Sequence, residues 1–350
     1  MTREELKYVD QHAVAPTAGA SVDHVKHTGP RVLRGAAARA FYPKLHWEKS
    51  ASRAPPVDVW AYPLDVVLVE KVEGAPAKFY VDDPAYQRAV QRYLTLDAAC
   101  VVCYASGSIV AVFVTARTMP SLARVAVQAR AALDGARCDL KARETFVGGD
   151  YDRGERKQAE NVKRHMVGTI WNEGLQTYNG LIWGKAFTQY TRRAPASSPA
   201  AFSLPFVGMY AAERAVVPAI ADVRLKLLKE ARLPCAFKGM PCAWMPATQV
   251  GISEDFAVTT HADSCVAGVT ESIFWANRNV PNARFAVTSC EVAFDIGKQP
   301  CLLFMKGNEM HGTVPGASGS CGLVLISKRN TLQRYDKGGY TDLTNVRPGA

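Results

Sequence analysis

The sequence lacks any apolar run long enough to cross a membrane. No uncharged hydrophobic stretch among its 350 residues reaches the roughly 20 residues that a membrane-spanning helix needs. The first ten residues, MTREELKYVD, are charged and contain no apolar segment of the kind found in secretory signals. These absences argue against an α-helical membrane protein, and we expect an intracellular protein with no membrane partner.

The nine cysteines lack the pattern of a disulfide framework. Their number is odd, and a chain of this length does not depend on disulfides to hold a core together. Cys100 and Cys103 form a C-x-x-C motif, but no second pair follows at the spacing of a zinc ribbon. Because the motif lies in an apolar, strand-like run, we expect buried thiols there and neither a zinc nor a redox site.

Acidic residues are also scarce, with 32 against 42 basic ones, which gives a net charge of +10. Such an excess fits a polyanionic partner such as nucleic acid, and it fits a basic soluble enzyme equally well. Basic residues cluster at Arg153–Arg164, Arg192–Arg193 and Lys328–Arg329. Each cluster is a candidate for binding phosphates, and each is equally consistent with a solvated basic face.

Hydrophobic residues make up 48% of the chain, enough for a substantial core. We expect an irregular basic N-terminal arm over residues 1–58 and a larger domain over 59–350. Within that domain, 59–195 would hold strands and helices, and 200–335 a helix followed by a β-rich core. A helix is expected over Val207–Arg232. This helix is either kinked at Pro218 or begins at that residue.

After Pro234, short β-prone runs alternate with turns, without intervening helices. This pattern predicts an α+β protein whose core is a jelly roll, that is, a double-stranded β-helix flanked by helices. The expected strand regions are Gln249–Ile252, Ala257–His261, Val266–Trp275, Arg284–Ile296, Cys301–Lys306, His311–Val314 and Cys321–Ser327.

The most informative residues are His261, Asp263 and His311. A His and an Asp two positions apart lie on the same face of a strand, because successive side chains alternate. His311 follows the turn Gly307–Asn308, which can deliver it to a strand start beside the first pair. Two imidazoles and one carboxylate can hold one face of a ferrous ion and leave the opposite positions open. The simpler alternative is that both histidines are ordinary polar residues at strand ends.

The segments HADSCVAGVTESIFW, FAVTSCEVAFDIGKQPCLLFMKGNEMHGTVPG and SCGLVLISKRN carry a family pattern over about residues 250–331. They resemble the TET/JBP oxygenases of nucleic-acid bases, and the Ala- and Arg-rich composition is reminiscent of green-algal members. The resemblance implies an Fe(II)-dependent dioxygenase in which His261, Asp263 and His311 are the metal ligands and the catalytic residues. It also implies that dioxygen and a co-substrate, ascorbate or 2-oxoglutarate, take part.

Two positions depart from the family pattern. The family's Arg that grips 2-oxoglutarate opens the last strand, where this chain has Ser320-Cys321-Gly322. Lys328 and Arg329 come only at the far end of that strand, so ascorbate is favoured, with Ser320, Lys328 and Arg329 as candidate co-substrate residues. The family's Asn or Asp that touches the target base is replaced by Val266. Ser264 and Asn179 are candidate substitutes, and Arg192 and Arg193 are candidate phosphate contacts.

The resemblance predicts that the substrate is methylated double-stranded DNA. The enzyme would modify the 5-methyl group of a flipped pyrimidine, 5-methylcytosine above all, in the nucleus. Three alternatives stay open from the residues alone. The chain could be a 2-oxoglutarate-dependent oxygenase of the same fold acting on a protein or small molecule, a non-catalytic nucleic-acid binder, or a basic structural protein.

Overall fold

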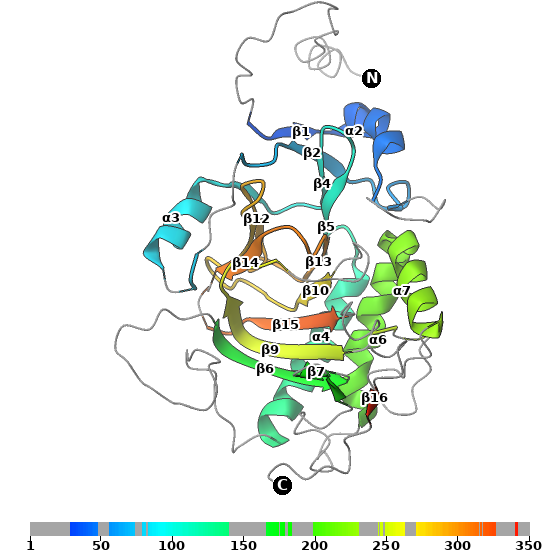
Figure 1. The fold of residues 1–350 in the computed structure, drawn as a ribbon, viewed down its shortest axis with the longest axis vertical. Coiled ribbons are helices and arrows are strands. Elements are labelled where there is room, and N and C mark those ends of the chain that lie inside the picture. Colours follow the sequence, from blue (N-terminus) through cyan, green and yellow to red (C-terminus); the bar gives the residue numbers. More distant parts are fainter. Residues whose placement is uncertain are drawn as a thin grey trace, which may run out of the picture.

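The computed structural model describes the chain over the following residues: 29–47, 56–73, 79–81, 83–139, 166–174, 176–178, 181–183, 199–230, 244, 246–247, 249–262, 271–314, 316, 318–326 and 340–341. Over these residues the protein is a mixed α+β structure built around one large sheet (Figure 1). The expected α+β class is therefore confirmed. No helix in this part of the chain is long and apolar enough to cross a membrane.

The large sheet has nine strands and carries most of the fold. In spatial order they are β1 (Arg31–Leu33), β2 (Asp65–Val69), β4 (Cys100–Tyr104), β5 (Ile109–Thr115), β13 (Cys301–Met305), β10 (Glu271–Trp275), β15 (Cys321–Ile326), β9 (Gln249–Val258) and β6 (Met166–Gly174). All neighbours pair antiparallel except β2 and β4, which are parallel. Strands distant in sequence thus become neighbours, and β13 connects the N-terminal strands to the C-terminal ones.

Two smaller sheets complete the β structure. One has the order β14 (His311–Val314), β11 (Arg284–Val287), β12 (Val292–Asp295) and β3 (Leu94–Leu96); the other has β16 (Tyr340–Thr341), β8 (Leu181–Trp183) and β7 (Gln176–Tyr178). The four-stranded sheet packs face to face on the large one. Phe113 of β5 lies 5.1 Å from Phe294 of β12, and Trp275 lies 5.4 Å from Phe285, measured between ring centroids.

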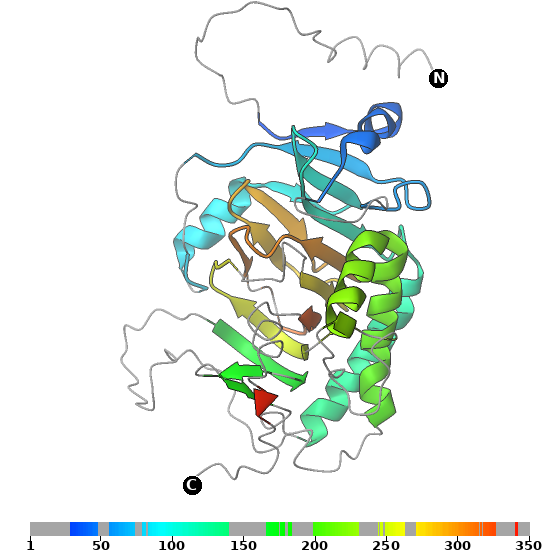
Figure 2. The ribbon, with the colours of Figure 1, turned by 45° about the vertical axis from the view of Figure 1, so that its right-hand side comes forward.

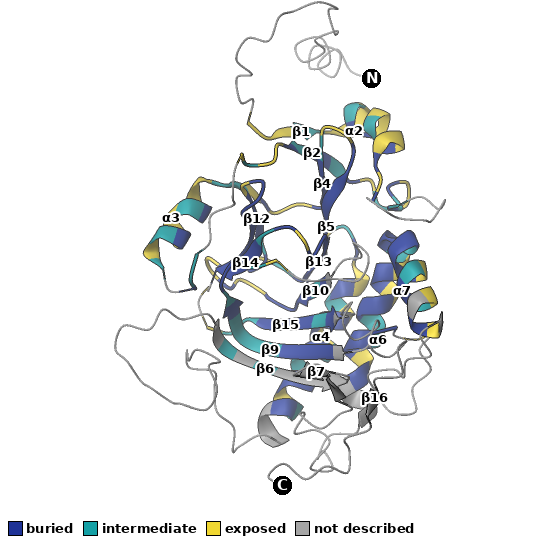
Figure 3. Ribbon diagram, in the orientation of Figure 1, coloured by how far each residue is buried: buried dark blue, intermediate teal, exposed yellow. Residues whose placement is uncertain are grey.

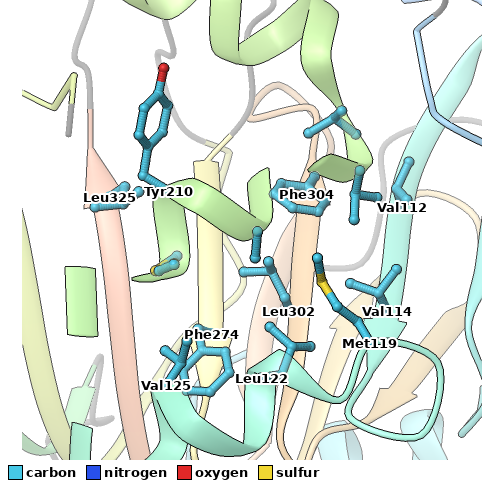
Figure 4. Close-up of a cluster of buried hydrophobic side chains, with 14 of the residues drawn as sticks. Val112, Val114, Met119, Leu122, Val125, Tyr210, Phe274, Leu302, Phe304 and Leu325 are labelled. Atoms are coloured by element: carbon cyan, nitrogen blue, oxygen red, sulfur yellow. The ribbon is translucent and has the colours of Figure 1, made fainter. Parts of the chain in front are cut away.

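Helices cover the opposite face of the large sheet (Figures 1 and 2). These are α4 (Ser121–Asp139), α6 (Pro199–Val216) and α7 (Pro218–Glu230). Alternate residues of β5 and β13 divide between the two faces. Val112, Val114, Leu302 and Phe304 join the core under the helices (Figure 4), whereas Phe113 and Leu303 join the core between the sheets. Strands buried on both faces read as continuous hydrophobic runs (Figure 3).

A charged cluster is buried between the helices and the sheet. Arg224 of α7 lies 3.2 Å from Glu213 of α6, measured from Nε to Oε1, and the two side chains are 1% and 0% exposed. The Ser272 hydroxyl of β10 donates to Glu213 Oε2 at 2.8 Å and accepts from Arg224 at 3.1 Å. Burial raises the pKa of the Glu213 carboxyl, while Arg224 and Ser272 oppose the shift.

A shorter helix, α3 (Pro84–Arg92), covers the outer face of the four-stranded sheet. Asp83 caps its N-terminus by accepting a hydrogen bond from the backbone of Ala85 at 2.8 Å, and Pro84 occupies the first turn. Its apolar side chains Tyr86 and Val90 pack against the outward-facing alanines of β11 and β12. The capping residue and the burial of one helix face explain why the chain turns helical here.

Several expectations about the elements need correction. Residues 31–44, assigned to an irregular arm, form β1, the helix α2 (Gly35–Phe41) and a 3-10 turn over Tyr42–Lys44. The expected helix over Val207–Arg232 is two helices, with Pro218 beginning the second. Helix α4 runs through Gly135 and ends at Asp139. The proposed division of the chain at residue 58 stays a prediction.

The expectation that the Cys100 and Cys103 thiols are buried is confirmed. Cys100 and Cys103 are free thiols, 2% and 0% exposed, in the middle of the sheet. Burial raises the pKa of the Cys103 thiol to about 12. A thiol with so little thiolate at neutral pH is a poor metal ligand and a poor nucleophile.

Candidate metal centre

The fold brings His261 and His311 side by side. The backbone N–H of each donates to the carbonyl of the other, at 2.7 Å and 2.8 Å, so that the residue pair extends the four-stranded sheet beyond β14. Directly opposite residues of an antiparallel pair point to the same face. The two imidazole centroids are accordingly 4.5 Å apart, with the rings tilted by 51°.

The pair faces the space between the two sheets. The His311 ring lies 5.5 Å from Phe285, nearly parallel to it, and Phe285 belongs to the core between the sheets. His311 is 2% exposed, whereas His261 is only partly buried. The imidazoles therefore form the edge of the inter-sheet core, one deep and one nearer to solvent.

Both rings are held in the same tautomer by the same local contact. His261 Nδ1 lies 2.8 Å from the carbonyl oxygen of Thr259, and His311 Nδ1 lies 2.8 Å from that of Glu309. A carbonyl oxygen can only accept, so each Nδ1 carries a hydrogen, and in the neutral ring Nε2 then carries the lone pair. Metal-binding histidines are oriented in this way, because the hydrogen bond at one ring nitrogen fixes the donor at the other.

Close backbone approach allows the histidine pair to form. A Cβ at Gly312 would lie 2.9 Å from the Val258 carbonyl oxygen, 2.9 Å from the Tyr86 hydroxyl and 3.1 Å from Thr260 Cα. Glycine at this position lets the strand leading to His261 lie against β14. Thr260 fixes the same strand from its other side. Its N–H donates to the carbonyl of Phe79 at 3.1 Å, and its hydroxyl accepts from the N–H of Phe79 at 2.7 Å.

A buried carboxylate anchors the turn before His311, and the sequence analysis missed it. Glu309 is 6% exposed and accepts hydrogen bonds from the hydroxyls of Tyr104 at 3.0 Å and Ser289 at 2.6 Å. Its backbone carbonyl is the one that orients the His311 ring. Its place two residues before His311 was the available signal, although nothing in the sequence identifies the two hydroxyl partners.

The inner face of the large sheet opposite the histidines is partly open. Ser253, Ile273 and Val324 point inward from β9, β10 and β15 and are partly exposed, whereas Ile252, Phe274 and Leu323 on the opposite face are buried. Gly322 leaves room for Ser253, since a Cβ there would lie 2.6 Å from the serine hydroxyl. The inward positions named here carry no positive charge, so the described part of this face offers no cation to a dicarboxylate.

The remaining candidate residues are placed as follows. Ser320 belongs to the turn before β15, where its N–H donates to Asp255 at 2.7 Å and its hydroxyl accepts from Asn277 at 3.1 Å. The other candidates lie outside the described residues: Asp263, Ser264, Asn179, Arg192, Arg193, Lys328 and Arg329. Among the residues that the structure describes, no three His, Cys, Asp or Glu side chains gather as a metal-binding group.

Two of the three expected ligands are nevertheless placed so that they could bind one metal ion. Two adjacent imidazoles with lone pairs on Nε2 supply two nitrogen ligands, and Asp263 follows His261 by two residues in the sequence. Trp275 of β10 is 5% exposed and packs on Phe285, so it belongs to the core rather than to a base-binding surface.

Comparison with known proteins adds little at the level of sequence. No family model matches the chain, and no curated protein matches it. Among solved structures, the chain is similar to NgTET1 in complex with 5mC DNA, with a TM-score of 0.44 and 11% identity over 68% of this chain and 79% of that one. A similarity of this size leaves the function to be argued from the residues.

Proposed function

We propose that this protein is an Fe(II)-dependent oxygenase whose metal ligands are His261, Asp263 and His311. The histidine pair carries the proposal, because two imidazoles from distant segments meet with both Nδ1 atoms held by backbone carbonyls. Exposed His46 makes the same contact between Nδ1 and a carbonyl two residues earlier, so that contact alone does not mark a metal ligand. The meeting of two such rings from distant segments favours a ligand role.

The strand pairing supports a jelly-roll core for this enzyme. Eight successive segments pair as a nested series: β9 with β15, the His261 segment with β14, β10 with β13, and β11 with β12. A long hairpin paired in this way and folded over into two facing sheets is the plan of a jelly roll. In that plan His261 and His311 come from the second and seventh segments.

Ferrous iron bound there would supply the activation of dioxygen for the oxidation of a C–H bond. The residues of this chain have separate tasks around it. The carbonyls of Thr259 and Glu309 hold the imidazoles in place, and Phe285 excludes water from one side of His311. The partly open face at Ser253 leaves room for a co-substrate.

Ascorbate is the co-substrate that we favour over 2-oxoglutarate. The inward face around Ser253 and Gly322 lacks a cation among its described residues, and a dicarboxylate needs a charge-assisted partner. Ascorbate carries a single negative charge delocalised over its enediol, and its hydroxyls can be held by hydrogen bonds, so it depends less on a cationic partner than a dicarboxylate does. Lys328 and Arg329 remain the candidates that would reverse this preference.

We propose the 5-methyl group of a pyrimidine as the site of modification, with 5-methylcytosine in nuclear DNA as the substrate. The support is the net charge of +10 together with the family pattern around the three ligands. Ser264 and Asn179 would contact the base, and Arg192 and Arg193 the phosphates. A base must leave the duplex to reach a site at the edge of two sheets.

The test is an assay on 5-methylcytosine-containing DNA, loaded with Fe(II) without oxygen and started by admitting air. Ascorbate and 2-oxoglutarate are supplied separately, and nucleoside mass spectrometry reads the product. His311→Ala and Asp263→Ala should abolish Fe(II) binding and turnover while leaving the fold intact. Wild-type activity in either variant would show the ligand assignment to be wrong.

His46 provides a matched control. Its Nδ1 also lies 3.0 Å from a carbonyl two residues earlier, that of Lys44, but the residue is exposed and lies in the N-terminal part of the fold. His46→Ala should bind iron as the wild type does. Equal losses in His46→Ala and His311→Ala would mean that metal binding is a general property of surface histidines.

A further inference from the structure

A second candidate site lies in the N-terminal part of the fold, at the opposite end of the large sheet from β9 and its histidine (Figure 2). Here a cavity of about 250 Å³ is lined by Tyr42, Pro43, Leu45, Pro56, Val57, Val59 and Trp60. Trp60 is 69% exposed, although its neighbours Val57 and Val59 are buried. An indole left so open beside an apolar cavity is unusual, because tryptophan is among the most hydrophobic surfaces a protein can bury.

The aromatic rings that line this cavity are held in place by contacts with the protein. Tyr42 is 7% exposed, and its hydroxyl donates to the carbonyl of Leu64 at 2.7 Å, so the ring cannot swing outward. The Trp60 ring lies edge to face against it, with centroids 5.5 Å apart and planes at 85°. The indole is therefore supported at one side, and most of its surface remains open to solvent.

Basic residues outnumber acidic ones around the cavity, where residues 56–65 contribute Asp58 and Asp65. Residues 29–47 contain four basic residues, all exposed, and no acidic one: Arg31, Arg34, Arg39 and Lys44. Arg34 forms an ion pair with Asp65 at 3.4 Å, which is exposed and hence weak. Lys44 lies between two cavity-lining residues, and Arg39 is close enough to Tyr42 to lower its pKa, although burial raises that pKa more strongly.

We propose that this surface binds a single-stranded nucleic-acid segment, with an unpaired base stacked on Trp60 and the flanking phosphates on Arg39 and Lys44. Proteins bind single strands by combining a positively charged track with aromatic rings on which bases stack. An open indole beside four exposed basic residues, with Asp58 and Asp65 as the acidic residues nearby, offers both features.

Other anionic partners fit the same residues less well. An anionic membrane would need several apolar side chains to insert, and Trp60 is the one large hydrophobic residue with high exposure recorded in the described residues 29–73. An acidic peptide would use the cations but has no planar group that requires an open aromatic face. The proposal does not depend on the iron site, and it can fail or succeed independently of the proposed oxygenase activity.

The test measures binding of a fluorescent, unmethylated oligothymidine of about 12 nucleotides to the metal-free, full-length protein. Trp60→Ala should weaken binding about 10-fold, and Trp60→Phe should restore much of the affinity, because a phenyl ring still stacks. Arg39→Ala and Lys44→Ala should each reduce the salt dependence of binding, with a change in slope of about 0.7.

Trp244 supplies the matched control, since it is also exposed, at 61%, and is absent from the lining of this cavity. Trp244→Ala should bind the oligonucleotide as the wild type does. Equal effects of the two tryptophan variants would overturn the proposal. So would binding to phosphatidylserine vesicles that requires Trp60, if the oligonucleotide does not bind at all.

Discussion

Two glutamates are buried in the part of the chain that the structure describes, and their carboxyl groups have different partners. Glu213 lies beneath the helices beside a buried guanidinium, and its Oε1 makes no hydrogen bond although Arg224 Nε is 3.2 Å away. Glu309 lies at the end of the sandwich and accepts from two hydroxyls. The first cluster connects α6 and α7 to the sheet, whereas the second fixes the turn that presents His311. Breaking them should therefore damage different properties, the first stability and the second metal binding.

The largest effect should follow from breaking the Glu213–Arg224 pair. Arg224→Met leaves a buried carboxylate without its cation, so we expect a loss of about 3–5 kcal/mol in the free energy of unfolding. The double variant Glu213→Leu with Arg224→Met should recover most of that loss, because no buried charge remains. Urea denaturation measures both. If the double variant is as unstable as Arg224→Met alone, the ion pair contributes more to stability than the cost of burying its two charges.

A smaller effect is expected where the strand of His261 meets β14. Gly312→Ala places a methyl group 2.9 Å from the Val258 carbonyl oxygen, so the two segments must separate. We expect a loss of about 1–3 kcal/mol in stability, together with weaker Fe(II) binding. Gly29→Ala is the control, since a Cβ there meets nothing within 4 Å. Unchanged iron affinity in Gly312→Ala would show that iron binding does not depend on the backbone pairing of the two segments.

Removing a hydroxyl from the Glu309 network should cost little stability. Tyr104→Phe deletes one hydrogen bond to the Glu309 carboxylate, which is worth about 1 kcal/mol, but should weaken iron binding about 10-fold. Tyr42→Phe removes a more deeply buried hydrogen bond, from the Tyr42 hydroxyl to the carbonyl of Leu64, and should leave iron affinity unchanged. Titration with Fe(II) without oxygen compares the two. Equal iron affinities would reduce Glu309 to a structural role.

The smallest effect concerns alkaline pH. Burial raises the pKa of the Cys103 thiol and of the Tyr210 phenol to about 12, so both prefer the protonated form when folded. Their contribution is complete below the pKa of the unfolded groups and is lost as the pH rises towards about 12. The urea midpoint should fall between pH 9 and 11, and less steeply in Tyr210→Phe. A flat profile in both proteins would contradict this burial effect.

The sequence predicted the C-terminal half well because its signals are local. Runs bounded by turn residues located β13, β14 and β15 and marked β11 and β12 as one region, and the alternation of side chains made His261 a candidate ligand. The sequence predicted that the strands carrying His261 and His311 lie side by side, but it did not predict that these two residues pair directly. Its backbone register depends on Gly312, whose role requires knowledge of the facing chain.

The features that the sequence did not predict depend on contacts between distant segments. Tyr104 and Ser289 reach Glu309 from 205 and 20 residues away, and no local pattern announces such partners. The helix α2 was missed because Ala- and Arg-rich residues beside Pro43 read as a loop, while burial of Ala38 and Tyr42 stabilises the helix and turn. Helix α4 passes Gly135 because Leu133 and Ala136 pack into the core.

The outermost strand of the large sheet has a consequence for self-association. An exposed sheet edge is a template for a strand of another molecule, and β1 forms that edge with only three residues. Exposed Arg31 and Arg34 mark its two ends, so a second copy approaching edge-on meets repulsion before it can pair. Behind β1 lies the uncharged stretch Val66–Val69 of β2, which would aggregate readily if left uncovered. The short edge strand β1 thus disfavours edge-to-edge association of the sheet with a second copy.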